Sequence, residues 1–162
     1  EIYLKIIGLK TASLFRGAFE SGGLIKNDER ENIKILRQLG EAFGMAYQII
    51  DDCEDLFADE DGDVLQEKIT LPLIHLFREK PSYFENYLKQ NLEELKLNVI
   101  RSGGFEYALS HARKYTIKGL ESLEKYPESK VKDALRGFFN YLDKKREKAL
   151  RGALKVTSEQ RN

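Results

Sequence analysis

The sequence has almost no cysteine, no net charge and no long apolar run, and each absence excludes a class of protein. The single cysteine, Cys53, excludes an internal disulfide and any cysteine-rich metal site. One unpaired thiol fits a reducing compartment, so we expect a cytoplasmic protein. No stretch reaches transmembrane length and no signal-peptide pattern is present, so we expect no integral membrane segment.

Opposite charges balance along the chain. Lysine and arginine total 27, and aspartate and glutamate also total 27. A net charge of zero gives no argument for a nucleic-acid partner, although a local basic patch stays possible. With 162 residues, 41% hydrophobic and 33% charged, the chain is long and apolar enough for one globular domain, which we expect to span residues 1–162.

Helical spacing of apolar residues dominates the sequence, and no segment has the alternation of a strand. Glycine and proline separate the helical stretches, and Pro127 marks the start of the last one. We therefore predict an all-α bundle of about six helices. They cover residues 2–21, 31–56 after a capping box at Asp28 and Glu31, 69–77, 82–100, 105–125 and 127 onward.

The first predicted helix is apolar on several sides, which favours burial in the middle of a bundle. Gly22-Gly23 is expected to end it. Lys10 interrupts its apolar surface, and the simplest interpretation of a lone lysine there is a side chain that reaches the surface. In the next helix, Gly40 and Gly44 remove side chains from one stripe, which predicts close packing against a neighbouring helix.

An acidic cluster follows an apolar lead-in at the end of the long second helix. Asp51, Asp52 and Asp55 stand at positions i, i+1 and i+4, so Asp51 and Asp55 lie one turn apart on one face. Gln48 precedes Asp52 by one turn. Such a cluster is common on exposed helices, but the apolar residues before it favour carboxylates that open into a cleft. Carboxylate oxygens in this arrangement suit magnesium.

Neither a calcium nor a zinc site fits the rest of the sequence. Acidic residues alternate after the long helix as in a calcium-binding loop, but Val64 stands where that loop needs glycine and Thr70 where it needs glutamate. The histidines, His75 and His111, are too isolated to indicate zinc. On an apolar helix, His75 is typical of a hydrogen-bonded core residue.

Three parts of the chain can contribute to one site. Lys10 and Thr11 come from the first helix, Gln48 and the three aspartates from the second, and Lys68 from the loop that follows. The carboxylates would bind magnesium, magnesium would bridge to phosphate oxygens, and lysines would neutralise the remaining charge. The ligand that this combination predicts is a diphosphate.

These residues resemble the C-terminal half of the trans-isoprenyl diphosphate synthases, the all-α prenyltransferases that make geranyl, farnesyl and geranylgeranyl diphosphate. The resemblance implies half of the isoprenoid synthase type I fold and extends over nearly the whole chain. It is carried by Lys10-Thr11-Ala12-Ser13-Leu14-Phe15, Gly40-x-x-x-Gly44-x-x-Tyr47-Gln48-x-x-Asp51-Asp52-x-x-Asp55, Lys68-x-Thr70-Leu71-Pro72-Leu73 and Ser102-Gly103-Gly104.

The resemblance implies a reaction and a role for each residue. Such enzymes condense an allylic diphosphate with isopentenyl diphosphate, with Mg²⁺ as cofactor. The three aspartates would form the second aspartate-rich motif and bind metal, and Asp51 and Asp52 would act in catalysis. Lys10, Thr11 and Gln48 would bind the allylic diphosphate and place dipoles near the developing cation. Lys68 would also contact the diphosphate.

Several expected motifs are missing from this chain. The first aspartate-rich motif is absent, as are the Gly-Gly-Lys and arginine set for isopentenyl diphosphate and the residues that set product length. The loop after Asp55 is short and lacks a Gly-Lys-x-x-Gly stretch, and Glu67 replaces the glycine usually found before Lys68. A chain with these omissions is expected to hold half of an active site.

A split synthase would explain these omissions. A separate chain would then supply the first motif and the isopentenyl site, and two such heterodimers would pair into a heterotetramer, because the family dimerises. The alternatives are a non-catalytic regulatory subunit of a prenyl synthase, a fragment of a longer single-chain synthase, and a helical interaction module.

Overall fold

Helices make up almost all of the computed structural model, which describes residues 1–57, 68–86 and 91–159. No strand occurs within these ranges, so the all-α prediction is confirmed. The chain divides into two compact units, residues 1–48 with 111–144 and residues 49–110 with 145–162. A single domain over residues 1–162 stays a prediction, and the interpretations of Val64 and Glu67 lie outside the described residues.

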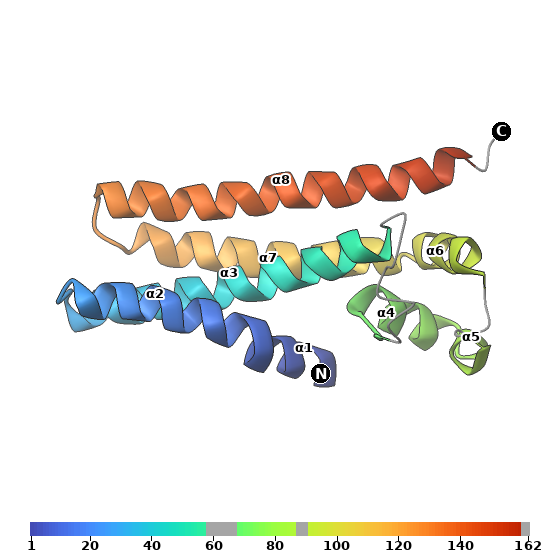
Figure 1. Ribbon diagram of the computed structural model, residues 1–162, viewed down its shortest axis with the longest axis horizontal. Coiled ribbons are helices and arrows are strands. Elements are labelled where there is room, and N and C mark those ends of the chain that lie inside the picture. The colour runs from blue at the N-terminus through green and yellow to red at the C-terminus, as the bar shows by residue number, and fades with distance from the viewer. Residues whose placement is uncertain (58–67, 87–90, 160–162) are drawn as a thin grey trace. The chain divides into compact units, whose positions relative to one another are not determined.

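Figure 1 shows the order of the helices along the chain. Among the described residues, no helix is both long enough and apolar enough to cross a membrane. The segments α1, η1 and α2 are continuous and count as one helix, so the described residues form seven helices, in agreement with the expected bundle of about six. In order, the elements are α1 Ile2–Ile7, the π-helical turn η1 Gly8–Ala12, α2 Ser13–Ile25, α3 Arg30–Leu56, α4 Leu71–Glu79, α5 Ser82–Asn86, α6 Leu92–Arg101, α7 Gly104–Glu124 and α8 Lys130–Glu159.

The first helical segment runs past Gly22-Gly23, so the predicted helix end is wrong. A Cβ on Gly23 would lie 2.8 Å from Leu36 Cδ1, which shows that Gly23 serves close packing against α3. The helix ends at Ile25, and Asn27, two residues later, has a left-handed φ of 54°. There the Asp28 N–H donates to the Gly23 carbonyl at 3.0 Å, which completes the helix end.

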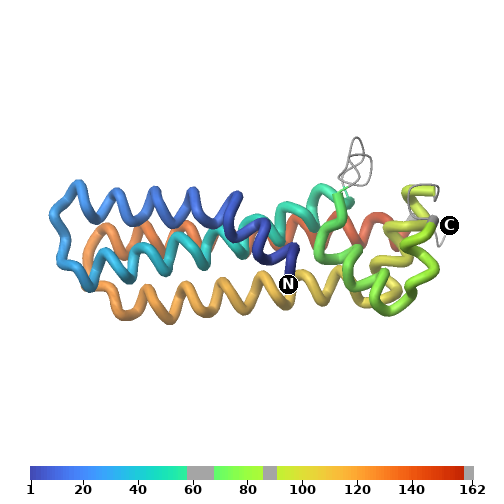
Figure 2. Tube along the Cα trace, turned by 90° about the horizontal axis from the view of Figure 1, so that it is seen from below, coloured from blue at the N-terminus to red at the C-terminus, as the bar shows by residue number. Residues whose placement is uncertain are grey.

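The start of α3 is tied to a distant turn and has no capping box. The backbone N–H of Asp28 donates to the Gly23 carbonyl, and the Glu31 carboxylate pairs with Lys34 at 3.0 Å. The reciprocal hydrogen bonds of the predicted capping box between Asp28 and Glu31 therefore do not form. Instead the Asp28 carboxylate accepts a hydrogen bond from the Tyr126 hydroxyl at 2.6 Å, and this bond is the main cause that lowers the pKa of Asp28. The bond joins the α2–α3 turn to the α7–α8 turn, which lie at the same end of the first unit (Figure 2).

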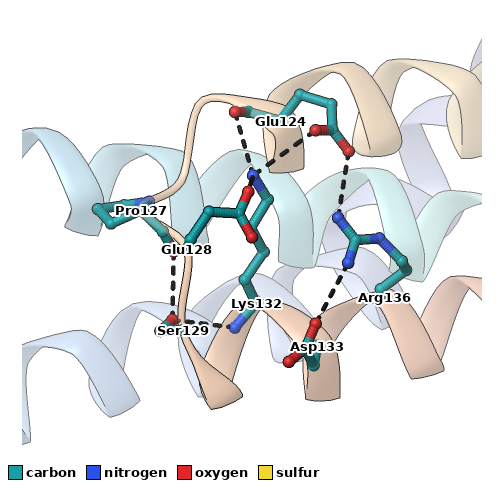
Figure 3. Close-up of polar contacts among 7 residues, drawn as sticks. All are labelled: Glu124, Pro127, Glu128, Ser129, Lys132, Asp133 and Arg136. Carbon is teal, nitrogen blue, oxygen red and sulfur yellow. Dashed lines mark hydrogen bonds and ion pairs between the residues drawn. The ribbon is translucent and has the colours of Figure 1, made fainter.

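A buried lysine organises the turn between α7 and α8 (Figure 3). Lys132 Nζ donates to Glu128 Oε1 at 2.6 Å and to the Glu124 carbonyl at 3.3 Å, although only 2% of the lysine side chain is exposed. The Ser129 hydroxyl accepts the Lys132 backbone N–H at 3.2 Å and caps the helix. The last helix therefore begins at Lys130, three residues later than predicted from Pro127, because Ser129 provides the cap.

The second unit breaks the helix predicted over residues 82–100. Asn91 has extended backbone, with ψ of 131°, and its side chain accepts the Glu93 N–H at 2.8 Å, so a new helix starts at Leu92. The predicted turn at residues 102–104 is confirmed, and Gly103 takes a φ of 76°. Core packing in this unit includes the Phe57 and Phe105 rings, whose centroids lie 5.1 Å apart.

The N-terminal segment is not buried on all sides, which corrects the expectation for residues 2–21. Ile2 is 78% exposed, Leu9 69% and Leu14 72%, whereas Ile7 and Ala12 are buried. The buried side faces α3, where glycines allow close contact, and the opposite side meets no other described helix. The segment thus presents an uncovered apolar face.

Candidate diphosphate site

The π-helical turn carries two of the predicted site residues. A π-helical turn admits one more residue than an α-helical turn and is frequent at functional sites. On this turn Lys10 is exposed, Thr11 is half-buried and Ala12 is fully buried against α3. The exposure of Lys10 fits both a diphosphate ligand and a plain surface lysine, so its role stays a prediction.

Thr11 and Gln48 meet in the first unit although 37 residues separate them. The Thr11 hydroxyl donates to Gln48 Oε1 at 2.7 Å, and both side chains are partly buried. This bond fixes which end of the Gln48 amide faces the π-helical turn. Two residues that the sequence assigned to one ligand are therefore brought together by the fold.

Glycines let α3 approach this turn closely, as predicted. A Cβ on Gly40 would lie 2.5 Å from the Phe15 carbonyl oxygen, and one on Gly44 would lie 2.6 Å from Ala12 Cα. Both obstacles are backbone atoms, which cannot rotate away. Any side chain at Gly44 would push η1 away from α3 and disturb the contact between Thr11 and Gln48.

The aspartates of α3 belong to the second unit and differ in environment. Asp52 is buried, at 6% exposure, whereas Asp51 and Asp55 are half-buried. Cys53 is also buried, and this burial, together with the neighbouring charges of Asp52 and Glu54, raises the pKa of its thiol. The cysteine therefore stays protonated and does not compete as a ligand.

Lysine side chains from α8 reach the same stretch of α3. Lys145 Nζ lies 2.7 Å from Asp51 Oδ1 and also contacts Glu54 Oε2, while Lys148 Nζ lies 3.2 Å from Glu54 Oε1. Burial acts against the charge of Lys145, but its hydrogen bonds to Asp51 and Glu54 outweigh burial and raise its pKa. The role of Lys145 could not be predicted from the sequence. It lies in a basic stretch about 90 residues from the aspartate cluster, and nothing in that stretch identifies which lysine will face the cluster.

A groove of about 540 Å³ separates the end of α3 from α8 within the second unit. One wall is acidic and the other is basic, so the groove can hold both a cation and the phosphate groups that accompany it. The charged residues that line it are Asp51, Glu54 and Asp55 on α3 and Lys145, Lys148, Arg151 and Lys155 on α8.

No complete metal centre forms within residues 1–57, 68–86 and 91–159, where no group of three His, Cys, Asp or Glu side chains could hold an ion. Magnesium does not require such a group, because it keeps several waters and binds through one or two carboxylates and substrate phosphates. Asp51 and Asp55, one helical turn apart and both lining the groove, offer hard oxygen donors of that kind. The donor chemistry thus fits Mg²⁺, with the remaining ligands supplied from outside this groove.

Lys68 lies just before α4 and is exposed, so it is accessible to a ligand. Close by in the sequence, Thr70 is 97% buried (3% exposed), and its hydroxyl lacks a hydrogen-bond partner among the described atoms. The structure places Lys68 in the second unit, whereas Lys10, Thr11 and Gln48 belong to the first.

His75 does not take part in this site. Its ring stacks on Tyr107 with centroids 4.6 Å apart, and its Nε2 lies 3.1 Å from the Ser102 carbonyl. The histidine is hydrogen-bonded, as predicted, but half-buried rather than in the core.

Residues 1–101 match the sequence model of the family described as polyprenyl synthetase. The chain belongs to the polyprenyl synthetase family. It is 33% identical over 150 residues to the all-trans-nonaprenyl-diphosphate synthase (geranyl-diphosphate specific) of Rhodobacter capsulatus, covering 83% of this chain and 46% of that protein. It is 26% identical over 159 residues to heptaprenyl diphosphate synthase component 2 of Bacillus subtilis, covering 89% and 45%.

A solved structure shares the fold of this polyprenyl synthetase chain. The geranylgeranyl pyrophosphate synthase from Corynebacterium glutamicum, complexed with calcium and isoprenyl diphosphate, matches with a TM-score of 0.79 and 27% identity. The match covers 88% of this chain and 49% of that one. The polyprenyl synthetase chain therefore spans a little under half the length of the relatives that it matches.

Proposed function

We propose that this chain is one subunit of a heteromeric trans-isoprenyl diphosphate synthase. The enzyme would condense an allylic diphosphate with isopentenyl diphosphate to give geranyl, farnesyl or geranylgeranyl diphosphate. One observation carries the proposal: the sequence holds a single DDxxD cluster and resembles a relative that is described as component 2 of a heptaprenyl diphosphate synthase.

The binding role of the chain rests on the residues around η1 and α3. Thr11 and Gln48 are already hydrogen-bonded, so a diphosphate would meet a preorganised pair rather than two mobile side chains. Lys10 and Lys68 are exposed and carry positive charge that a diphosphate requires. These four residues would hold the allylic diphosphate while its carbon–oxygen bond breaks.

The metal role rests on the acidic end of α3. Asp51 and Asp55, which line the groove, would bind the metal there. Asp52, the third ligand expected from the sequence, is buried and does not line the groove, and the three side chains do not form a ready metal-binding group. Bound Mg²⁺ would supply charge neutralisation of the leaving diphosphate. The complex of the Corynebacterium relative with calcium and isoprenyl diphosphate supports a divalent cation in this role.

The partner would be a chain that carries the first aspartate-rich motif and the isopentenyl diphosphate site. The uncovered apolar face of α1 and α2, including Ile2, Leu9 and Leu14, gives such a partner a surface to cover. A relative described as component 2 supports a synthase made of more than one component. Two heterodimers would then pair into a heterotetramer in the cytoplasm.

A regulatory subunit without catalytic residues is the alternative that the binding residues argue against. A scaffold would need neither the Thr11–Gln48 hydrogen bond of the first unit nor the aspartate cluster of the second. Binding of a diphosphate by this chain separates the two functions, because a catalytic subunit must contribute to the ligand site.

We expect the complex with a first-motif partner to bind an inert allylic thiolodiphosphate only when Mg²⁺ is present. Replacing the buried ligand, Asp52→Ala, should weaken this binding at least about tenfold, as lost metal ligation does. Asp143→Ala, on an exposed part of α8, is the control and should bind like the wild type. Calorimetric titration checks both, and unchanged affinity for Asp52→Ala in an intact complex would support the regulatory alternative.

A further inference from the structure

Lys145 is a half-buried cation that the proposed chemistry does not use. Its side chain is 10% exposed, compared with 81% for Lys148 on the next turn of α8. It contacts two carboxylates at once, Asp51 and Glu54, so its position is fixed from both sides. A lysine in a purely solvated basic stretch would not be buried in this way.

The lysines contact the carboxylates of Glu54 and Asp51 in different ways. Both oxygens of Glu54 face lysines, since Oε2 meets Lys145 and Oε1 meets Lys148. Asp51 meets Lys145 through Oδ1 at 2.7 Å, which directs its second oxygen, Oδ2, to a different position. Glu54 and Asp51 both line the groove, but the lysines hold them in different ways.

The orientation of a carboxylate oxygen matters for binding of magnesium. It demands near-octahedral geometry with oxygen distances of about 2.0–2.1 Å, so a ligand must present one oxygen in a defined direction. Side chains that orient a metal ligand typically change metal affinity by about 10–100-fold when they are removed. A cation on Oδ1 of Asp51 is such an orienting contact.

We propose that Lys145 is a positioning residue that orients Asp51 for Mg²⁺ and holds Glu54 away from the metal. This inference rests on the proposed function, because it takes Asp51 as a metal ligand. Lys145 itself touches neither metal nor substrate. It acts through the Asp51 carboxylate, and its charge remains on α8 throughout.

Two possible roles of Lys145, repulsion of the metal and orientation of Asp51, predict opposite changes in Mg²⁺ affinity when the lysine is removed. If the lysine only repelled the metal, the variant Lys145→Met would bind Mg²⁺ more tightly. If it orients Asp51, the same variant binds Mg²⁺ more weakly. The direction of the change therefore decides the question.

The test uses the complex of this chain with a first-motif partner. We expect Lys145→Met to raise the Mg²⁺ concentration for half-maximal activity about tenfold or more, with KM for isopentenyl diphosphate unchanged. Mg²⁺ titration by calorimetry, with an inert allylic thiolodiphosphate bound, should show the same shift without turnover. Lys144→Met removes an exposed lysine of α8 that does not line the groove, and it should leave the Mg²⁺ dependence as in the wild type.

A double variant keeps the test decisive if Lys145→Met alone unfolds. In Lys145→Met with Glu54→Gln, the charge that Glu54 would otherwise share with Lys148 alone is gone, but Asp51 still lacks its orienting contact, so Mg²⁺ binding should remain weak. Wild-type Mg²⁺ dependence in either Lys145 variant, or tighter binding, overturns the inference. An inactive wild-type complex would instead count against the proposed function, so the two failures are distinguishable.

Discussion

Asp51→Ala should lower the condensation rate of the reconstituted complex about 1000-fold. Asp51 lines the groove with one oxygen on Lys145, and its loss would remove both a metal ligand and the negative charge that holds the metal. A thousandfold loss corresponds to about 4 kcal/mol of transition-state stabilisation, within what a metal ion can provide. Initial rates of radiolabelled isopentenyl incorporation at saturating Mg²⁺ measure it.

Assembly of the complex should survive this substitution. Asp51 keeps 30% of its side chain exposed, and Lys145 retains Glu54 as a partner, so neither the core nor α8 loses its packing. Size-exclusion chromatography with light scattering provides the check, and Asp143→Ala again serves as the surface control. Turnover within about threefold of wild type would show that Asp51 does not bind the catalytic metal.

Gly44→Ala should destabilise the first unit by about 1–3 kcal/mol. The new methyl would lie 2.6 Å from Ala12 Cα, so η1 or α3 must move. Alanine would gain up to about 1 kcal/mol of helix propensity, which is too little to offset that displacement. Urea unfolding of the same complex at fixed concentration measures the change, and weaker diphosphate binding should accompany it because Thr11 sits beside Ala12.

Gly17→Ala is the matched control for the same chemical change. Gly17 is also a helical glycine, but a Cβ there meets nothing within 4 Å. Its replacement should therefore stabilise the chain by up to about 1 kcal/mol, through propensity alone. If both variants gained stability, the close approach of α3 to η1 would be wrong.

The long helix and its glycines could be predicted from the sequence because local rules decide them. The apolar spacing of α3 continues without a breaker up to Leu56, and Gly40 and Gly44 could serve only close packing at that spacing. That Thr11 and Gln48 would share one site was also predicted, because their positions resemble a known motif, but their hydrogen bond to one another was not. In each case the signal lies in a short stretch of residues.

Features decided by tertiary contacts could not be predicted in this way. Gly23 continues α2 because Leu36 and α3 pack on it, and the π-helical turn leaves no pattern in the composition. Lys145 meets Asp51 from 94 residues away, which no local rule foresees. By contrast, the break at Asn91 carried a local signal, since an Asn cap before Glu93 and Glu94 is a typical helix start.

The N-terminal helical segment is exposed on one side, although its sequence predicted burial on several sides. Its apolar residues predicted burial on every side, and the structure buries one side only. A sequence pattern records every surface that a helix buries, including surfaces against other chains. This exposed side is the one that the proposed partner chain would cover.

The most direct test of the split-synthase account is the activity of this chain with and without its partner. We predict that the purified chain alone incorporates no radiolabelled isopentenyl diphosphate above background, because it has a single aspartate-rich motif. Addition of a chain that carries the first motif should restore Mg²⁺-dependent prenyl diphosphate synthesis, which Asp51→Ala should remove. Full synthase activity from the lone chain would contradict the account.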